Sequence, residues 1–135
     1  MANETILIVD DDPDFTSATA ATLESAGYAV ATSNDGTVGL DLARSLKPDL
    51  IVLDVMMSYV LEGLSVGAQL QADPDLKKIP ILMLSAIVRT EHVGDFPTDE
   101  PLPAQFYMTK PVPAAKLIET VRWLLDRAKA ASASA

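Results

Sequence analysis

The sequence predicts an α/β fold in which helices cover both faces of a parallel sheet of five strands. Five short apolar segments recur along the 135 residues, and stretches with helical patterning separate most of them. This alternation is typical of parallel sheets with right-handed crossovers. The length matches one domain, and no internal repeat or long linker divides the chain. A doubly wound sheet is therefore the expected architecture.

The five apolar segments are the expected strands. The first, third and fourth are continuous apolar runs, which suits strands that are buried on both faces of a sheet. The second is weaker. In chain order, the expected strands cover residues 5–9, 28–31, 50–53, 81–84 and 106–108.

The first expected helix begins at Asp12-Pro13, because an acidic N-cap followed by proline favours helix initiation. Gly27 is expected to end it. The residues of this helix that should share one face are Phe15, Ala18, Thr22 and Leu23.

A second helix is expected over Thr37–Leu46, with Val38, Leu42 and Leu46 on one stripe. Lys47-Pro48 should end this helix, because a residue before proline avoids the helical region. A weaker helix is expected over Leu64–Gln71.

The last helix should open at Pro113. Its apolar stripe should contain Leu117, Val121 and Leu124, with Ile118 and Leu125 beside it.

The segment Ile87–Gln105 does not fit a regular pattern, because it contains Gly94 and three prolines. We expect at most a short helix near Val88–Val93, followed by an extended loop.

Composition excludes several classes of function. The net charge of −9 opposes direct binding to nucleic acid or to an anionic membrane surface. The absence of cysteine excludes disulfides, thiolate metal sites and a cysteine nucleophile. His92 is the single histidine and is expected to be solvated rather than to accept phosphate. Without a signal-peptide pattern or an apolar run of roughly 20 residues, a soluble cytoplasmic domain is expected.

Polar side chains follow four of the expected strands. The first strand ends in Asp10-Asp11-Asp12, the third in Asp54, the fourth in Ser85 and the fifth in Lys110. Ligands bind outside the carboxyl ends of strands in open α/β sheets, so these side chains should converge at one edge. Asp12 precedes Pro13 and is expected to cap the helix rather than to bind a metal.

This set of residues predicts phosphoryl-transfer chemistry. Clustered carboxylates repel one another, and a hard divalent cation relieves that repulsion. Oxygen ligands without histidine or cysteine indicate Mg²⁺. With a hydroxyl and a lysine nearby, one carboxylate could attack phosphorus and become an aspartyl phosphate.

Four segments resemble the signatures of response regulator receiver domains. They are ILIVDDDPDF, PDLIVLDVMM, PILMLSA and YMTKPV, and they occur in the family's order at the expected strand ends. The resemblance implies a flavodoxin-like fold with strand order 2-1-3-4-5. It also implies a receiver domain over residues 1–127, followed by a flexible Ala/Ser-rich tail at 128–135.

The resemblance implies a role for each residue at the metal. Asp54 matches the aspartate that is phosphorylated, and Asp11 matches a direct Mg²⁺ ligand. Asp10 matches an acidic residue that acts largely through water. Met56 matches the position whose backbone carbonyl completes the metal shell.

The resemblance also implies contacts to the phosphoryl group. Ser85 and Lys110 match the hydroxyl and the amine that bind phosphoryl oxygens, and Tyr107 matches the aromatic switch residue that works with Ser85. The phosphoryl group would come from a phospho-histidine on a sensor histidine kinase or a histidine phosphotransfer protein. We expect no turnover enzyme and no attached output domain in 135 residues, so signalling would occur through contact with a downstream protein.

Trp123 is a candidate interface residue. It lies almost opposite the apolar stripe of the last helix, among charged residues. A contact with a partner or with a second copy of the chain would use such an aromatic side chain. Flat packing against charged stems is the equal alternative.

Two departures from the family pattern leave other functions open. Ser58 replaces a proline and the loop Ser58–Gly63 is longer than usual, while Ile87–Gln105 is irregular where receivers place their fourth helix. These departures favour the alternative of a degenerate receiver that acts as a phosphorylation-independent docking module. A Mg²⁺-dependent phosphatase is disfavoured, because Met56 occupies the position of the acid/base carboxylate that such enzymes need.

Overall fold

A computed structural model of the chain describes residues 4–54, 68–85, 106–109 and 112–134. The helices are α1 (Pro13–Ser25), α2 (Gly36–Leu46) and α4 (Ala114–Ser134), and residues 68–72 form a further short helical segment. The strands are β1 (Thr5–Val9), β2 (Ala29–Ser33), β3 (Leu50–Asp54), β4 (Ile81–Ser85) and β5 (Phe106–Thr109).

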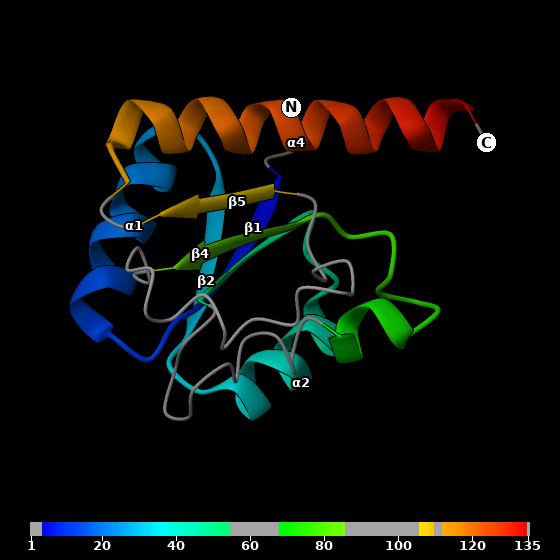
Figure 1. The fold of residues 1–135 in the computed structure, drawn as a ribbon, viewed down its shortest axis with the longest axis horizontal. Coiled ribbons are helices and arrows are strands. Elements are labelled where there is room, and N and C mark those ends of the chain that lie inside the picture. Colours follow the sequence, from blue (N-terminus) through cyan, green and yellow to red (C-terminus); the bar gives the residue numbers. More distant parts are fainter. Residues whose placement is uncertain (1–3, 55–67, 86–105, 110–111, 135) are drawn as a thin grey trace, which may run out of the picture.

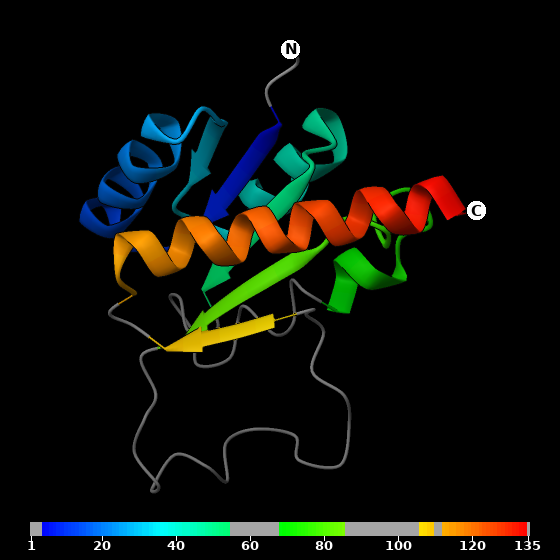
Figure 2. The same cartoon turned by 90° about the horizontal axis from the view of Figure 1, so that it is seen from above.

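The five strands form one parallel sheet with the order β2-β1-β3-β4-β5. The predicted fold class and strand order are confirmed, because each strand lies where an apolar segment predicts one. Figures 1 and 2 show the sheet as a central layer with α4 on one side and α2 on the other. Because all five strands are parallel, their carboxyl ends lie at the same edge of the sheet.

The strands bury both of their faces, as the continuous apolar runs predict. In β1, Leu7 and Val9 point into one core, and Ile6 and Ile8 point into the other. The first core lies under α2 and the 68–72 segment, and it includes Leu40 and Leu70. The second lies under α1 and α4. Its helical members are Leu23, Leu117, Val121, Leu124 and Leu125.

The predicted ends of α1 are confirmed, but its predicted face is only partly right. Asp12 caps the helix, and Gly27 follows it with a φ of 100°, a conformation that favours glycine. Leu23 is buried as expected, whereas Ala18 is exposed. Thr16 and Thr19 are buried instead; Thr16 donates its hydroxyl to Pro13 O, which offsets the cost of burying it.

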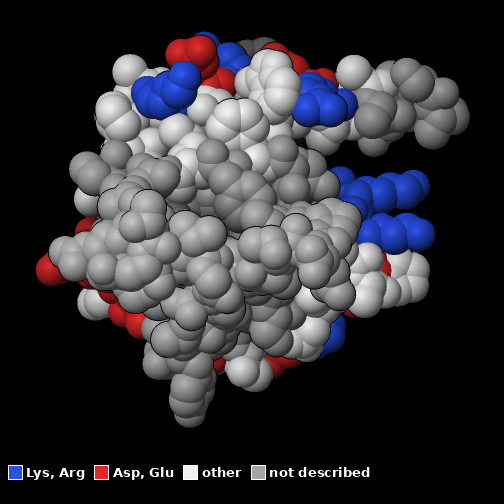
Figure 3. Space-filling view, in the orientation of Figure 1, with Lys and Arg blue, Asp and Glu red and all other residues white. Residues whose placement is uncertain are grey.

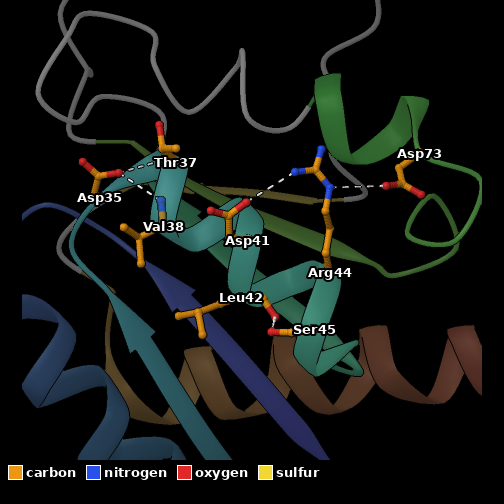
Figure 4. Close-up of polar contacts among 8 residues, drawn as sticks. All are labelled: Asp35, Thr37, Val38, Asp41, Leu42, Arg44, Ser45 and Asp73. Atoms are coloured by element: carbon orange, nitrogen blue, oxygen red, sulfur yellow. Dashed lines mark hydrogen bonds and ion pairs between the residues drawn. The ribbon is translucent and has the colours of Figure 1, made fainter.

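The predicted apolar stripe of α2 is not its buried face. Val38 and Leu46 are 53% and 41% exposed. The buried residues are Gly36, Gly39, Leu40 and Ala43. Small residues face the sheet because the helix lies very close to β1 there. Of the predicted stripe, only Leu42 is partly buried and packs against the core; Figure 4 shows it beside Val38 on one flank of α2. Lys47 ends the helix before Pro48 in a left-handed conformation, with a φ of 48°.

Arg44 ties the outer side of α2 to the turn that follows residues 68–72. Its Nε lies 3.7 Å from Asp73 Oδ2, and its guanidinium also donates to Asp41 over 3.5 Å. Figure 4 shows Arg44 between these two carboxylates. The arginine is half exposed, so these pairs contribute modestly, at most about 1 kcal/mol each.

The stripe predicted for the last helix is confirmed, since Leu117, Val121 and Leu124 are buried. The helix continues to Ser134, where the sequence predicts a flexible tail from residue 128. Alanine has the highest helix propensity, which accounts for helix in this Ala-rich stretch. Lys129 also forms an ion pair with Glu4 at the start of β1. The domain boundary at residue 127 stays a prediction.

Several predictions fall partly or wholly outside the described residues. Helix is present at 68–72, whereas the first half of the predicted helix Leu64–Gln71 is not described. The irregular segment Ile87–Gln105, with His92 and the short or irregular fourth helix, lies entirely outside the described residues. The loop Ser58–Gly63 does too. Among the described residues, no helix combines the length and apolar character needed to cross a membrane.

Gly39 allows α2 to approach β1, and replacing it should expose that constraint. A Cβ at position 39 would lie 2.8 Å from both γ-carbons of buried Val9. We expect Gly39→Ala to lower the free energy of unfolding by about 1–2 kcal/mol, measured by urea denaturation, despite the better helix propensity of alanine. In a Val9→Ala background the same change should be neutral or stabilising. Strictly additive effects of the two changes would contradict this account.

The ion pair between Glu4 and Lys129 should make the end of α4 sensitive to acid. The hydrogen bond from Lys129 lowers the pKa of Glu4 below its ordinary value of 4.5. The stabilisation is therefore complete above about pH 4.5 and is lost as the pH falls through the lowered pKa. The protection factors of amides near residue 129, which are corrected for the intrinsic pH dependence of hydrogen exchange, should fall over that acidic range. In Lys129→Met this fall should disappear; an identical pH response of the protection factors in both proteins would refute the assignment.

Candidate functional site

The register of the sheet places two aspartates side by side at its carboxyl edge. Parallel β1 and β3 pair Val9 with Leu53, so the next residues are Asp10 and Asp54. Both side chains are almost fully buried, with residue exposures of 1% and 4%. Asp11 follows as an exposed residue of the β1–α1 loop. One carboxylate oxygen from each of Asp10, Asp11 and Asp54 lies within 4.8 Å of the other two.

Hydrogen bonds from the backbone fix the loop that carries Asp10 and Asp11. Asp10 N donates to Ser33 O over 3.0 Å, and Asp10 Oδ1 accepts from Asp12 N over 3.0 Å. Asp12 turns its carboxylate toward α1, where it accepts from Asp14 N and Phe15 N. The prediction that Asp12 caps the helix is confirmed. The cluster thus consists of Asp10, Asp11 and Asp54, without Asp12.

Asn34 also contacts this loop, and sequence reasoning missed it. The residue follows β2, and its Nδ2 donates to Asp10 O over 2.8 Å and to Thr16 Oγ1 over 3.3 Å. Asn34 is the first residue after the observed β2, which ends at Ser33. The sequence predicts this weak strand only as far as residue 31, so the strand-end rule does not reach Asn34.

The electrostatics of the cluster favour a cation. Three carboxylates this close repel one another when ionised, and two of them are largely removed from water. Residues 1–43, which include β1, α1 and the loop between them, contain no lysine or arginine. Figure 3 shows acidic side chains at the left margin of the molecule, toward which β4 and β5 run in Figure 1, and charges of both signs elsewhere on that face. The arrangement can hold a divalent metal ion.

The other predicted site residues are described less completely. Ser85 is the last residue of β4 and pairs with Thr109, the last residue of β5; Tyr107 lies within β5 and pairs with Met83. The ends of β4 and β5 are thus level at the same edge as the aspartates. Lys110 and Met56 lie outside the described residues.

Trp123 lies on the outer face of α4, as the sequence predicts, and is 45% exposed. Phe106 meets its ring edge to face, with 5.7 Å between centroids. The guanidinium carbon of Arg127 lies 4.7 Å from the centre of the same ring. A cation–π contact and an aromatic contact therefore hold the indole in place.

Comparison with known proteins identifies the family. The family model described as response regulator receiver domain matches residues 6–122. The DNA-binding dual master transcriptional regulator RpaA of Synechocystis sp. is 39% identical over 123 residues, which are 90% of this chain and 49% of that protein. The chain spans about half the length of the curated relatives that it matches.

Solved structures show the same fold. The CheY-like receiver domain protein of Methanospirillum hungatei is 24% identical and superposes with a TM-score of 0.81, covering 95% of this chain and 98% of that one. The chemotaxis response regulator CheY4 of Vibrio cholerae is 27% identical with a TM-score of 0.77, covering 91% and 99%. The chain belongs to the response regulator receiver domains, the modules that accept phosphoryl groups in two-component signalling.

Proposed function

We propose that the chain accepts a phosphoryl group on Asp54 from a phospho-histidine of a sensor histidine kinase or histidine phosphotransfer protein. The observation that carries this proposal is the cluster of Asp10, Asp11 and Asp54 at the carboxyl edge of the sheet. In the transfer, an oxygen of the Asp54 carboxylate forms a bond to phosphorus as the bond from phosphorus to the imidazole nitrogen breaks. The product is an aspartyl phosphate. The protein is its own acceptor and turns nothing over.

Mg²⁺ is the metal that fits this cluster. The donor atoms are all oxygens, and three carboxylates within 4.8 Å match the preference of a hard divalent ion. Asp10, Asp11 and Asp54 would hold it, joined by the backbone carbonyl of Met56. When bound, the ion supplies positive charge that neutralises phosphoryl oxygens.

The remaining residues would act on the phosphoryl group once it is attached. The hydroxyl of Ser85 would donate to one phosphoryl oxygen, and the ammonium of Lys110 would pair with another. Ser85 would thereby couple phosphorylation to Tyr107. This tyrosine lies on the neighbouring strand β5, two residues before Thr109, which pairs with Ser85. We propose that the altered surface then binds a downstream protein in the cytoplasm without contacting nucleic acid or membrane, and that Trp123 contributes to such a contact or to a homodimer.

The cluster should respond to removal of one charge in two opposite ways. Without metal, Asp11→Asn should stabilise the fold by roughly 1 kcal/mol, because it relieves repulsion among carboxylate oxygens that lie within 4.8 Å of one another. With Mg²⁺, the wild type should gain about 1.4 kcal/mol at ten times the dissociation constant, and Asp11→Asn should gain much less. Thermal unfolding with and without Mg²⁺ measures both effects.

Asp14→Asn is the matched control, since Asp14 is an exposed acid in the first turn of α1 but is no member of the cluster. It should keep the full response to Mg²⁺. If Asp11→Asn responds to Mg²⁺ as strongly as the control does, Asp11 is not a ligand.

Phosphorylation itself should depend on Asp54. Incubation with Mg²⁺ and acetyl phosphate should add the mass of one phosphoryl group to the wild type, bound in an acid-stable, base-labile form. Asp54→Asn should gain none. Asp49→Asn is the matched control, because Asp49 precedes β3 at the opposite edge of the sheet.

Other results of that experiment separate the competing functions. Absence of phosphate on the wild type would indicate a docking module. Continuous turnover of acetyl phosphate without accumulation on Asp54 would indicate a phosphatase. Either result overturns the proposal.

A further inference from the structure

We infer that Asn34 is a positioning residue for the metal cluster, acting through the backbone of the β1–α1 loop. The inference rests on the proposed function, because it assigns Asn34 a role toward the Mg²⁺ that Asp10, Asp11 and Asp54 would hold. Asn34 itself touches none of the three carboxylates in the described hydrogen bonds; it touches the peptide that joins Asp10 to Asp11.

The two contacts of the Asn34 amide fix its orientation. Asp10 O can only accept a hydrogen bond, so the atom 2.8 Å from it must be the amide nitrogen. Thr16 donates its own hydroxyl hydrogen to Pro13 O over 3.0 Å, so its oxygen accepts from Asn34. Each of the two amide hydrogens is thereby used, and the side chain bridges the loop to the first turn of α1.

These contacts hold both sides of Asp10 to the end of β2. Asp10 N donates to Ser33 O, and Asp10 O accepts from Asn34. The peptide group between Asp10 and Asp11 therefore cannot rotate without breaking the bond to Asn34. That peptide sets the direction in which the Asp11 side chain leaves the loop.

The need for such a clamp follows from charge. Mutual repulsion would drive exposed Asp11 away from buried Asp10 and Asp54 in the absence of metal. A neutral donor on a backbone carbonyl resists this movement without adding a charge to the site. Groups that orient ligands from outside the metal shell typically change metal affinity 10–100-fold when they are replaced.

Two substitutions distinguish positioning from charge. Asn34→Ala removes both donors, and Asn34→Asp has the same shape but places an acceptor against two acceptors. Asn34→Asp also adds a negative charge near the cluster, which by charge alone would tighten Mg²⁺ binding. Positioning predicts the opposite, so both variants should bind Mg²⁺ about tenfold more weakly than the wild type by isothermal titration calorimetry.

Ser33→Ala is the control for a merely structural effect. Ser33 is the last residue of β2 and directly precedes Asn34; its hydroxyl donates to Asp35 O over 2.8 Å and accepts from Asp35 N over 3.2 Å. Its replacement removes two hydrogen bonds but leaves the carbonyl that Asp10 N binds. Thermal unfolding of the metal-free proteins should show comparable destabilisation of Ser33→Ala and Asn34→Ala, with Mg²⁺ affinity kept only in Ser33→Ala.

The outcomes separate this inference from the proposed function. Unchanged Mg²⁺ affinity in Asn34→Ala, tighter binding in Asn34→Asp, or an equal loss in Ser33→Ala would overturn the role of Asn34 alone. A wild type that binds Mg²⁺ but is not phosphorylated on Asp54 would overturn the phosphoryl transfer, while the same titrations still decide on Asn34. A wild type that binds no Mg²⁺ overturns both.

Discussion

Crowding of negative charge at the carboxyl edge of the sheet is the constraint on which the arrangement of this receiver depends. Asp10 and Asp54 are nearly buried and lie beside Asp11, and residues 1–43 contain no lysine or arginine. Such a cluster costs free energy in the folded protein unless a cation enters. In the metal-free protein, the rest of the fold has to hold the three carboxylates together against this repulsion. It does so with rigid strands and with hydrogen bonds to the loop backbone.

The packing of the sheet determines how precisely the cluster is held. Val9, the residue before Asp10, is buried against Gly39 of α2, and a single Cβ at that position would meet its side chain at 2.8 Å. On the other face, Ile8 packs into the core under α1 and α4. The end of β1 is therefore tightly packed on both faces of the sheet. Tight packing of this kind transmits displacement, because protein interiors have few voids to absorb it.

The sequence alone was sufficient to predict the strand order of the sheet and the proximity of the three aspartates, for a physical reason. Strands buried on both faces leave a continuous apolar run, and the carboxyl ends of parallel strands share one edge. The face of α2 could not be read in this way, because Gly36, Gly39 and Ala43 pack through their small size rather than their hydrophobicity. The burial of Thr16 in α1 was also missed, because a local hydrogen bond from its hydroxyl to Pro13 O offsets the cost of burying it. Asn34 was missed because β2 has the least apolar sequence of the strands, and its apolar pattern stops at residue 31, before the strand ends at Ser33. The roles of Ser85, Tyr107, Lys110 and Met56 stay predictions.

The pairing of Glu4 with Lys129 brings the start of β1 and the late turns of α4 together at the amino edge of the sheet. The acidic cluster lies at the other edge, the full length of the strands away. A fluorophore, affinity tag or fusion partner attached near Glu4 or Lys129 would therefore lie at the edge of the sheet opposite Asp10, Asp11 and Asp54. Among the described residues, the Glu4–Lys129 pair and the aspartate cluster have no member in common. A structural change caused by phosphorylation would therefore have to be transmitted through α4 and the strands to reach such an attachment.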